Sequence, residues 1–330
     1  MKRNSNNNNA LDETLLIKGG DIHKQVQDYA KSLLIQSNDT KKINLFFLAT
    51  EIENKIKELT QHDPLQPLNA GIAFPTGLSV NECAAHWSPN PSDNRKMLTE
   101  SDIVKIDFGV QLNGHILDGA FSYSFSDRYD DLIQVSQDAT SCGIKHAGPD
   151  AILGEIGADI QEIIENSEVE INGKLCPVKS TVDLCGHQIK QYHIHGGKAV
   201  PNIKIDYHER MVIGEQYAIE TFPTTGTGRA LVKKDYKFND CSHFMIPNNA
   251  IVRQNVPKNQ LKTYSMIYDH FGSLAFCNRW LPTEINKTNF EFLCKKHIQC
   301  YPPVYDTKGS YVAQTEKSIY IAENGCVILN

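Results

Sequence analysis

The spacing of apolar residues divides the chain into helical and β-rich stretches. In residues 11–59 apolar side chains recur three and four positions apart, which predicts helices. Residues 128–167 show the same spacing. Residues 168–245 instead indicate short strands joined by glycine-containing turns. Residues 1–10 are polar and rich in asparagine, a composition that predicts disorder.

The strongest local signal is a hairpin centred on Asn113-Gly114. Two β-rich runs, VKIDFGV and HILDGAF, flank this dipeptide, which favours a two-residue turn. Such a turn sets Asp107 opposite Ala120 and makes Asp118 its diagonal neighbour on the same face. Diagonal neighbours lie roughly 7–8 Å apart at the backbone, so the two carboxylates are expected to converge.

This aspartate pair has two interpretations. Two carboxylates held close together repel each other unless a proton or a cation lies between them. An arbitrary pair of strand aspartates is more often simply solvated. Here, however, Asp107 and Asp118 both lie in apolar runs, where an unpaired carboxylate is costly to bury. That context favours metal binding.

Three other segments carry matching ligand types. Glu220 lies in QYAIETF, Glu316 in SYVAQTEKSIYI and His187 in DLCGHQI. Because carboxylates can bridge, these side chains and the two aspartates suffice for two divalent ions, which activate a shared water when they lie ~3.5–4 Å apart. The spacing of these residues along the sequence does not show whether the five segments lie close together in the folded protein.

The remaining histidines are weaker candidates. A lone histidine is more often a satisfied core or surface residue than a functional one. His86 follows Cys83 in ECAAHWSPNP, so a Cys/His nucleophile pair is one alternative. His193 and His195 alternate in QYHIHGGK and would share a strand face, which leaves a zinc pair as another. As functional groups, His86, His195 and His243 would stabilise an oxyanion or position a substrate.

Composition narrows the class of protein. The 330 residues are 40% hydrophobic, enough for one large domain or one domain with an insertion. A net charge of −6 shows no basic excess, so no nucleic-acid partner is expected. Nine cysteines without a CxxC pair favour free thiols in a reducing compartment. No run of ~20 apolar residues is present, so we expect a cytoplasmic protein without membrane contact.

Six blocks of this sequence resemble type 2 methionine aminopeptidases in order and spacing. The blocks are NAGIAFPTGLSVNECAAHWSPNP, VKIDFGVQLNGHILDGAFS, LCGHQIKQYHIHGGKAVP, YAIETF, CSHFMI and YPPVYDTKGSYVAQTEKS. The resemblance implies an α+β pita-bread fold over residues 11–330, with the helical insertion of the type 2 enzymes at 247–300. Creatinase, prolidase and aminopeptidase P share this fold, so fold alone does not decide the substrate.

The resemblance also implies roles for individual residues. It implies two divalent metal ions, of Mn, Fe, Co or Zn, with the ligands Asp107, Asp118, His187, Glu220 and Glu316. The residues it places around the substrate are Phe74, His86, Ile194, His195, His243 and Tyr301. A hydroxide bridging the ions would attack the scissile carbonyl, with Glu220 as proton shuttle and His86 and His195 as catalytic histidines.

The expected activity is removal of the N-terminal methionine from nascent proteins, with a preference for a small second residue. The partners are then N-terminal peptides. The ribosome stays open as a partner, because only MKRNSNNNNA stands where related eukaryotic enzymes carry a long charged extension. The last block reads Thr315-Glu316-Lys317, where the family usually has F-E-H. On a strand, Lys317 would point away from Glu316.

Three alternatives remain. A non-catalytic protein of the same fold would bind RNA or protein and hold no metal. An Xaa-Pro peptidase would prefer Met-Pro or Gly-Pro peptides to Met-Ala. In a purely structural protein the acidic residues would be solvated, which does not explain why they recur in apolar runs.

Overall fold

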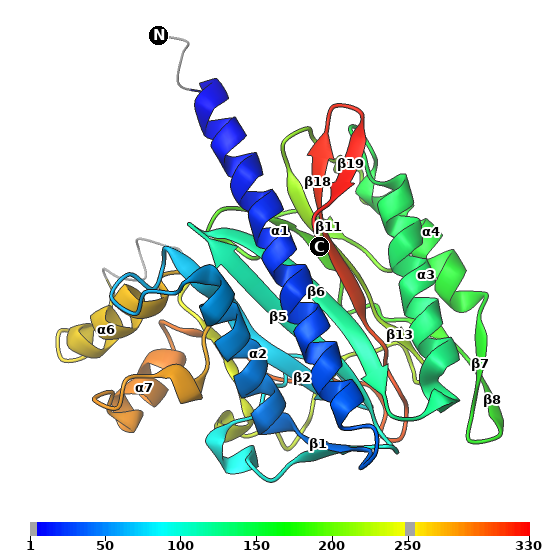
Figure 1. Cartoon of the computed structure of the whole chain (residues 1–330), viewed down its shortest axis with the longest axis horizontal. Helices are drawn as coiled ribbons and strands as arrows, with labels where there is room; N and C mark the ends of the chain where they lie inside the picture. The colour runs from blue at the N-terminus through cyan, green and yellow to red at the C-terminus, as the bar shows by residue number, and fades with distance from the viewer. Residues whose placement is uncertain (1–4, 248–254) are drawn as a thin grey trace.

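An antiparallel sheet of eight strands forms the centre of the molecule (Figure 1). The computed structural model describes residues 5–247 and 255–330, with side chains from residue 13 onward. The strands follow the order β11-β10-β12-β18-β6-β5-β2, and β19 pairs with β18 beside that path. Their bounds are β2 Ala70–Val80, β5 Ile103–Leu112, β6 His115–Ser124, β10 Gly186–Ile189, β11 Ala199–Val200, β12 Gln216–Thr221, β18 Thr315–Ala322 and β19 Gly325–Ile328.

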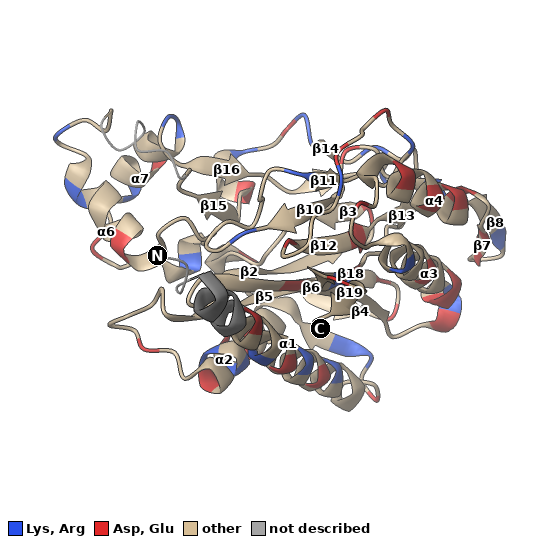
Figure 2. Ribbon diagram, turned by 90° about the horizontal axis from the view of Figure 1, so that it is seen from above, with Lys and Arg blue, Asp and Glu red and all other residues tan. Residues whose placement is uncertain are grey.

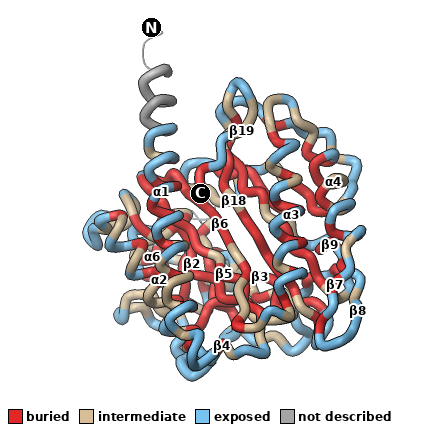
Figure 3. The backbone as a smooth tube through the Cα atoms, turned by 45° about the vertical axis from the view of Figure 1, so that its right-hand side comes forward, coloured by how far each residue is buried: buried red, intermediate tan, exposed pale blue. Residues whose placement is uncertain are grey.

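Two pairs of helices cover one face of this sheet (Figures 1 and 2). The first pair, α1 (Ser5–Gln36) and α2 (Leu45–Thr60), packs on β6, β5 and β2. In the second pair, α3 (Asp130–His146) contacts β12 and β18, and α4 (Leu153–Glu165) packs against α3. Figure 3 shows the central strands buried and the outer turns of the helices exposed. Each helix pair therefore closes one half of the core.

Helix α2 illustrates why these segments fold as they do. Its N-cap residue Asn44 accepts a hydrogen bond from the backbone N–H of Phe47 at 2.9 Å, and Gln61 ends the helix in a left-handed conformation. The buried apolar residues recur at helical spacing, and they are Leu45, Leu48, Ala49, Ile52 and Ile56. The apolar residues thus have the helical spacing that the sequence pattern predicted, and α2 packs on β2.

The start of α1 differs from the prediction. The sequence predicted disorder over residues 1–10, whereas the helix begins at Ser5; residues 1–4 lie outside the described residues. Asparagine is only moderately unfavourable in helices, and extending a formed helix is much easier than nucleating one. The asparagine tract can therefore continue the helix that the apolar spacing starts further along.

The predicted hairpin is confirmed. Strands β5 and β6 pair antiparallel with Asp107 opposite Ala120, and Asn113 and Gly114 have φ values of 49° and 80°. Two positive φ angles in a two-residue loop are the mark of a type I′ turn. The turn fixes the register, and the register sets which side chains share a face.

Residues 243–301, which include the range 247–300 predicted as a helical insertion, form a region with a small sheet at its base. It contains α6 (Leu261–Phe271) and α7 (Lys287–Cys294), and β15 (His243–Met245) pairs with β16 (Gln299–Tyr301). Residues 248–254 of the predicted insertion lie outside the described residues. The insertion has its own apolar cluster, which includes Phe244, Tyr264, Ile267, Phe276, Phe290 and Leu293.

Short elements complete the fold. The remaining strands are β1 Lys42–Asn44, β3 Cys83–Ala85, β4 Met97–Thr99, β7 Glu168–Ile171, β8 Lys174–Pro177, β9 Lys179–Ser180, β13 Pro223–Thr224, β14 Leu231–Val232 and β17 Val304–Tyr305. The 3-10 helices are η1 Pro91–Asp93, η2 Asp127–Tyr129, η3 Phe238–Asp240 and η4 Asn278–Trp280. None of the helices in the described ranges combines the length and apolarity that crossing a bilayer requires.

Candidate metal centre

Five neighbouring strands each contribute one of the predicted metal ligands. In sheet order the residues are His187 on β10, Glu220 on β12, Glu316 on β18, Asp118 on β6 and Asp107 on β5. Glu220 lies directly opposite Glu316, and both Glu316 and Asp107 lie opposite Ala120. Asp118 and His187 are each two residues from that row along their strands, so all five side chains share one face.

This face is the one that the helices do not cover. Phe108, the neighbour of Asp107, stacks on His23 of α1 with ring centroids 4.3 Å apart. Ile219, the neighbour of Glu220, is buried in the cluster under α3 and α4. Because neighbouring side chains alternate across a sheet, the helices anchor the strands from behind while the ligands face a cavity.

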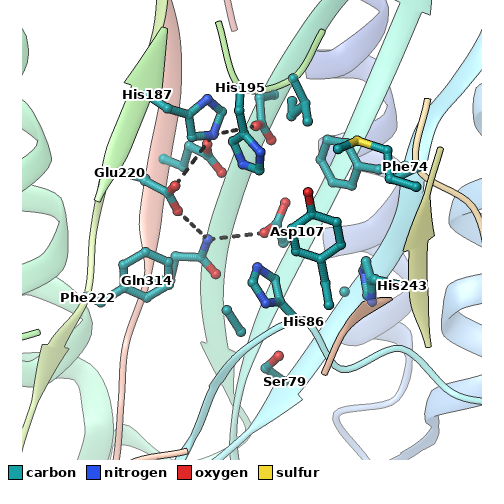
Figure 4. Close-up of a pocket in the computed structure, with 18 residues that line it drawn as sticks. Phe74, Ser79, His86, Asp107, His187, His195, Glu220, Phe222, His243 and Gln314 are labelled. Atoms are coloured by element: carbon teal, nitrogen blue, oxygen red, sulfur yellow. Dashed lines mark hydrogen bonds and ion pairs between the residues drawn. The ribbon is translucent and has the colours of Figure 1, made fainter. Parts of the chain in front are cut away.

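The ligand side chains lie close together (Figure 4). Nε2 of His187 is 3.6 Å from Oδ2 of Asp118 and 3.7 Å from Oε1 of Glu220. Ligand atoms of Asp118, His187 and Glu316 all lie within 4.8 Å of one another. Asp107 and Glu220 complete the group through Gln314, whose Nε2 donates to Asp107 Oδ2 at 3.2 Å and to Glu220 Oε2 at 3.3 Å.

Several of these ligand atoms are buried without a donor. Asp118 is 4% exposed and Glu316 is 2% exposed. Oδ1 of Asp107, Oδ1 of Asp118 and Oε1 of Glu316 have no hydrogen-bond partner among the described residues. No lysine or arginine in the described ranges lines the cavity. Buried acceptors normally have partners, so this cluster fits a divalent cation.

The electrostatics of the cluster agree with that fit. Burial raises the pKa of Asp107 to about 6. Burial and then the neighbouring carboxylates raise the pKa values of Asp118, Glu220 and Glu316 well above their ordinary range. Burial lowers the pKa of His187 to about 3, so this imidazole is neutral at pH 7 and free to ligate. A divalent cation would favour the charged carboxylates that the metal-free cluster disfavours.

The cavity beside the carboxylates is lined by every predicted substrate residue. These residues are Phe74, His86, Ile194, His195, His243 and Tyr301. The ring of His195 lies 4.8 Å from that of His187, and the ring of His86 lies 5.8 Å from that of Tyr301. Burial lowers the pKa of His86 to about 4 and that of His195 below its ordinary value, so both are neutral near pH 7.

The two alternative histidine pairings do not form. His193 does not line the cavity, and its Nδ1 lies 2.8 Å from the carbonyl oxygen of Gln191. The segment is a series of turns rather than a strand, so His193 and His195 do not share a face. The Cys83 thiol donates to the carbonyl oxygen of Ala85 at 3.8 Å, and burial raises its pKa, so it is not an activated nucleophile beside His86.

On β18, Lys317 points away from Glu316, as the sequence predicted. Lys317 pairs opposite Ile219 and therefore faces the helices, away from Glu316. Its pKa is lowered by burial and then by Lys31 and Lys24 of α1. The family-typical histidine is replaced at a position that does not reach the cavity.

Sequence reasoning missed several residues of the site. Gln314 is the main one, since it links Asp107 and Glu220. The others line the cavity and are Gly77, Ser79, Ala85, Phe222, Met245 and Ala275. The available signal for Gln314 was its position two residues before Glu316, which period-two alternation places on the ligand face. The apolar residues carried no comparable signal.

Replacing Gln314 by alanine should weaken metal binding without unfolding the protein. The amide holds the two outer carboxylates in place, and losing a group that orients metal ligands typically costs about 10- to 100-fold in affinity. Competition with a fluorescent chelator would measure the change in Kd. Gln134→Ala, which removes an amide on the surface of α3, is the matched control and should leave the Kd unchanged. Equal affinities in all three proteins would contradict the assigned role.

Known proteins resemble this chain in sequence and in fold. The profile of metallopeptidase family M24 matches residues 15–241. Methionine aminopeptidase 2-2 of Neosartorya fischeri is 40% identical over 321 residues, which cover 95% of this chain and 67% of that protein. Methionine aminopeptidase 2-1 of Aspergillus fumigatus is 41% identical, with 95% and 64% covered. The chain thus spans about two thirds of the length of these relatives.

Solved structures with low sequence identity share the fold. A thermophilic Arx1 superposes with a TM-score of 0.77 at 14% identity, covering 96% of this chain and 90% of that chain. Methionine aminopeptidase from Rickettsia prowazekii gives a TM-score of 0.62 at 19% identity, with 97% of both chains covered.

Fold, ligand set and these similarities together define a metal-dependent peptidase with the pita-bread fold. The chain belongs to metallopeptidase family M24.

Proposed function

We propose that this chain is a type 2 methionine aminopeptidase, which removes the N-terminal methionine from nascent polypeptides. The observation that carries the proposal is the convergence of four carboxylates and one histidine beside a histidine-lined cavity. Relatives about 40% identical over most of the chain are methionine aminopeptidases 2, which supports the substrate. The insertion with α6 and α7 supports the type 2 assignment.

The ligand arrangement supports a site for two ions. Asp118 and Glu316 lie centrally in the row and would help to hold both ions. Asp107 lies on one side of them, and His187 and Glu220 lie on the other. An oxygen-rich set with one imidazole suits Mn, Fe, Co or Zn, and ligand chemistry alone does not choose among them.

When bound, two divalent ions would polarise the scissile carbonyl and lower the pKa of the attacking water. Glu220 would accept the proton of that water and return it to the leaving amine. Its Oε2 accepts a hydrogen bond from Gln314, which holds the carboxylate in place beside the position of that water. Neutral His195 would donate a hydrogen bond to the developing oxyanion.

The apolar residues that line part of the cavity support selection of methionine. Phe74, Ile194, Met245 and Ala275 give the cavity an apolar portion, which would bury an unbranched thioether. Crowding near His86, whose ring lies 5.8 Å from that of Tyr301 and 6.0 Å from that of His243, would favour a small second residue.

Peptide hydrolysis tests this function. We expect release of methionine from Met-Ala-Ser in the presence of Mn²⁺ or Co²⁺, much slower release from Met-Pro-Ser and Gly-Pro-Ala, and none from acetyl-Met-Ala-Ser. An Xaa-Pro peptidase would instead cleave Met-Pro-Ser and Gly-Pro-Ala faster than Met-Ala-Ser. Absence of turnover with every metal, together with no bound metal, would instead indicate a non-catalytic member of the fold. Chromatography of the released amino acid measures each case.

A further inference from the structure

The loop that follows His86 is held in place from behind by residues outside the cavity. His86 has a φ of +65°, a left-handed conformation that residues with a side chain rarely adopt. A residue keeps such a conformation only where its surroundings over-determine it. The partners of this loop therefore decide where the His86 imidazole points.

Arg279 of η4 is the first of these partners. Its Nη1 donates to Oγ of Ser88 at 2.9 Å and to the carbonyl oxygen of Pro89 at 3.0 Å. Both acceptors lie within three residues of His86 in the chain. The Arg279 side chain is only 8% exposed, so its charge requires a buried counter-ion.

Glu53 of α2 supplies that counter-ion. Its carboxylate forms an ion pair with Nη2 of Arg279 and accepts a hydrogen bond from Nε1 of Trp280 at 2.9 Å. It also accepts one from the backbone N–H of Thr76 in β2 at 3.3 Å. The pair therefore joins α2, β2 and the insertion at one point behind the cavity.

A second set of contacts runs from the same loop to His243. The N–H of Ser88 donates to Oγ of Ser242 at 2.9 Å, and this Oγ lies 3.1 Å from both the His86 carbonyl oxygen and Nδ1 of His243. Nε2 of His243 lies 3.2 Å from the carbonyl oxygen of Pro75, a pure acceptor, so that nitrogen carries the proton. The rings of His86 and His243 lie 6.0 Å apart at one end of the cavity (Figure 4).

The geometry points to Arg279 and Glu53 as a buried pair of positioning residues that sets the orientation of His86 and, through Ser242, of His243. Neither member of the pair lines the main cavity, so both act through these histidines. The inference rests on the proposed function, in which His86 and His243 face the substrate. In this inference the insertion contributes to the site in two ways. Ala275 lines the cavity, and Arg279 positions the loop that follows His86.

Substitutions at the pair separate positioning from general stability. Arg279→Met and Glu53→Gln should each lower kcat for Met-Ala-Ser roughly 10- to 100-fold, with little change in KM or metal content, because small misplacements of active groups are costly. The double variant should be no worse than the poorer single variant, since the two residues act as a unit. Arg279→Lys keeps the charge but not the planar fork and should fall between wild type and Arg279→Met.

The matched control is Arg229→Met. It also removes an arginine–carboxylate pair, with Asp183, but this pair lies outside the cavity. Its kcat should equal that of wild type. A drop in this control as large as in Arg279→Met would overturn the inference.

A readout that does not depend on activity completes the test. Diethyl pyrocarbonate acylates neutral imidazoles, and mass spectrometry resolves the peptide that contains His86 from the one that contains His146 on α3. Release of the loop should accelerate modification at His86 while leaving His146 unchanged. Unchanged kcat and unchanged His86 reactivity in folded Arg279→Met would overturn the inference, as would equal acceleration at both histidines. A wild-type protein that releases no methionine would overturn the proposed function, while the modification rates would still decide the positioning role.

Discussion

Replacing Asp118 by asparagine is expected to abolish peptide hydrolysis and, at the same time, to stabilise the metal-free protein. Asp118 is buried at the centre of the ligand row, where burial and Asp107 raise its pKa well above its ordinary range. Its ionised form therefore opposes folding at pH 7 when no cation is bound. Asparagine removes the charge while keeping the shape, but its neutral amide is a much weaker ligand for a divalent cation than a carboxylate is.

The expected loss in kcat/KM is at least ~10³-fold, because metal-ion catalysis supplies several kcal/mol of transition-state stabilisation. The melting temperature of the metal-free variant should rise by roughly 1–3 °C. Peptide assays and differential scanning calorimetry measure the two effects. Asp183→Asn, which removes a carboxylate outside the cavity, should retain activity. Full activity in Asp118→Asn would refute the metal-ligand assignment.

Chelation is expected to have an effect of similar size on the wild-type protein. Treatment with EDTA should abolish methionine release, and Mn²⁺ or Co²⁺ should restore it and bind at two ions per chain. Binding to the folded state alone also stabilises that state, by ~2.7 kcal/mol at a metal concentration 100 times the Kd. Elemental analysis, activity and melting curves on the same samples measure these changes together.

The pH dependence of that stabilisation has a definite sign. Asp107 has a folded-state pKa raised from 3.8 to about 6, so its contribution to stability is greatest below its ordinary pKa and is lost as pH rises through about 6. Asp118, Glu220 and Glu316 shift in the same direction. The increase in melting temperature caused by metal should therefore grow from pH 4 to pH 7. An increase that stays constant over this range would contradict the electrostatic account of the site.

Local patterns predicted those parts of the site that local geometry controls. Asn113-Gly114 allows only a tight hairpin, and this hairpin fixes Asp107 and Asp118 on one face. The same alternation placed Lys317 on the opposite face from Glu316. In contrast, His193 and His195 were expected to share a face, but their segment forms turns to which the period of two does not apply.

Long-range pairing was beyond the reach of these patterns. Nothing in the sequence around Glu316 indicates that β18 lies between β12 and β6, so the convergence of the ligands rested on the family resemblance. Gln314 was missed because an uncharged amide in a strand-like run gives no electrostatic signal. The ion pair of Glu53 with Arg279 joins residues 226 positions apart, and each residue alone resembles an ordinary surface charge.

The position of β18 has a consequence for the synthesis of this protein. The strand follows both β6 and β12 in the sequence, yet it pairs with β12 on one side and β6 on the other, in the middle of the sheet. Until translation has delivered β18, β6 and β12 have no partner across the gap between them, and the candidate metal centre lacks Glu316. We therefore expect hydrolase activity and capture of metal only after β18 has been made, so that metal binding would report this step of assembly.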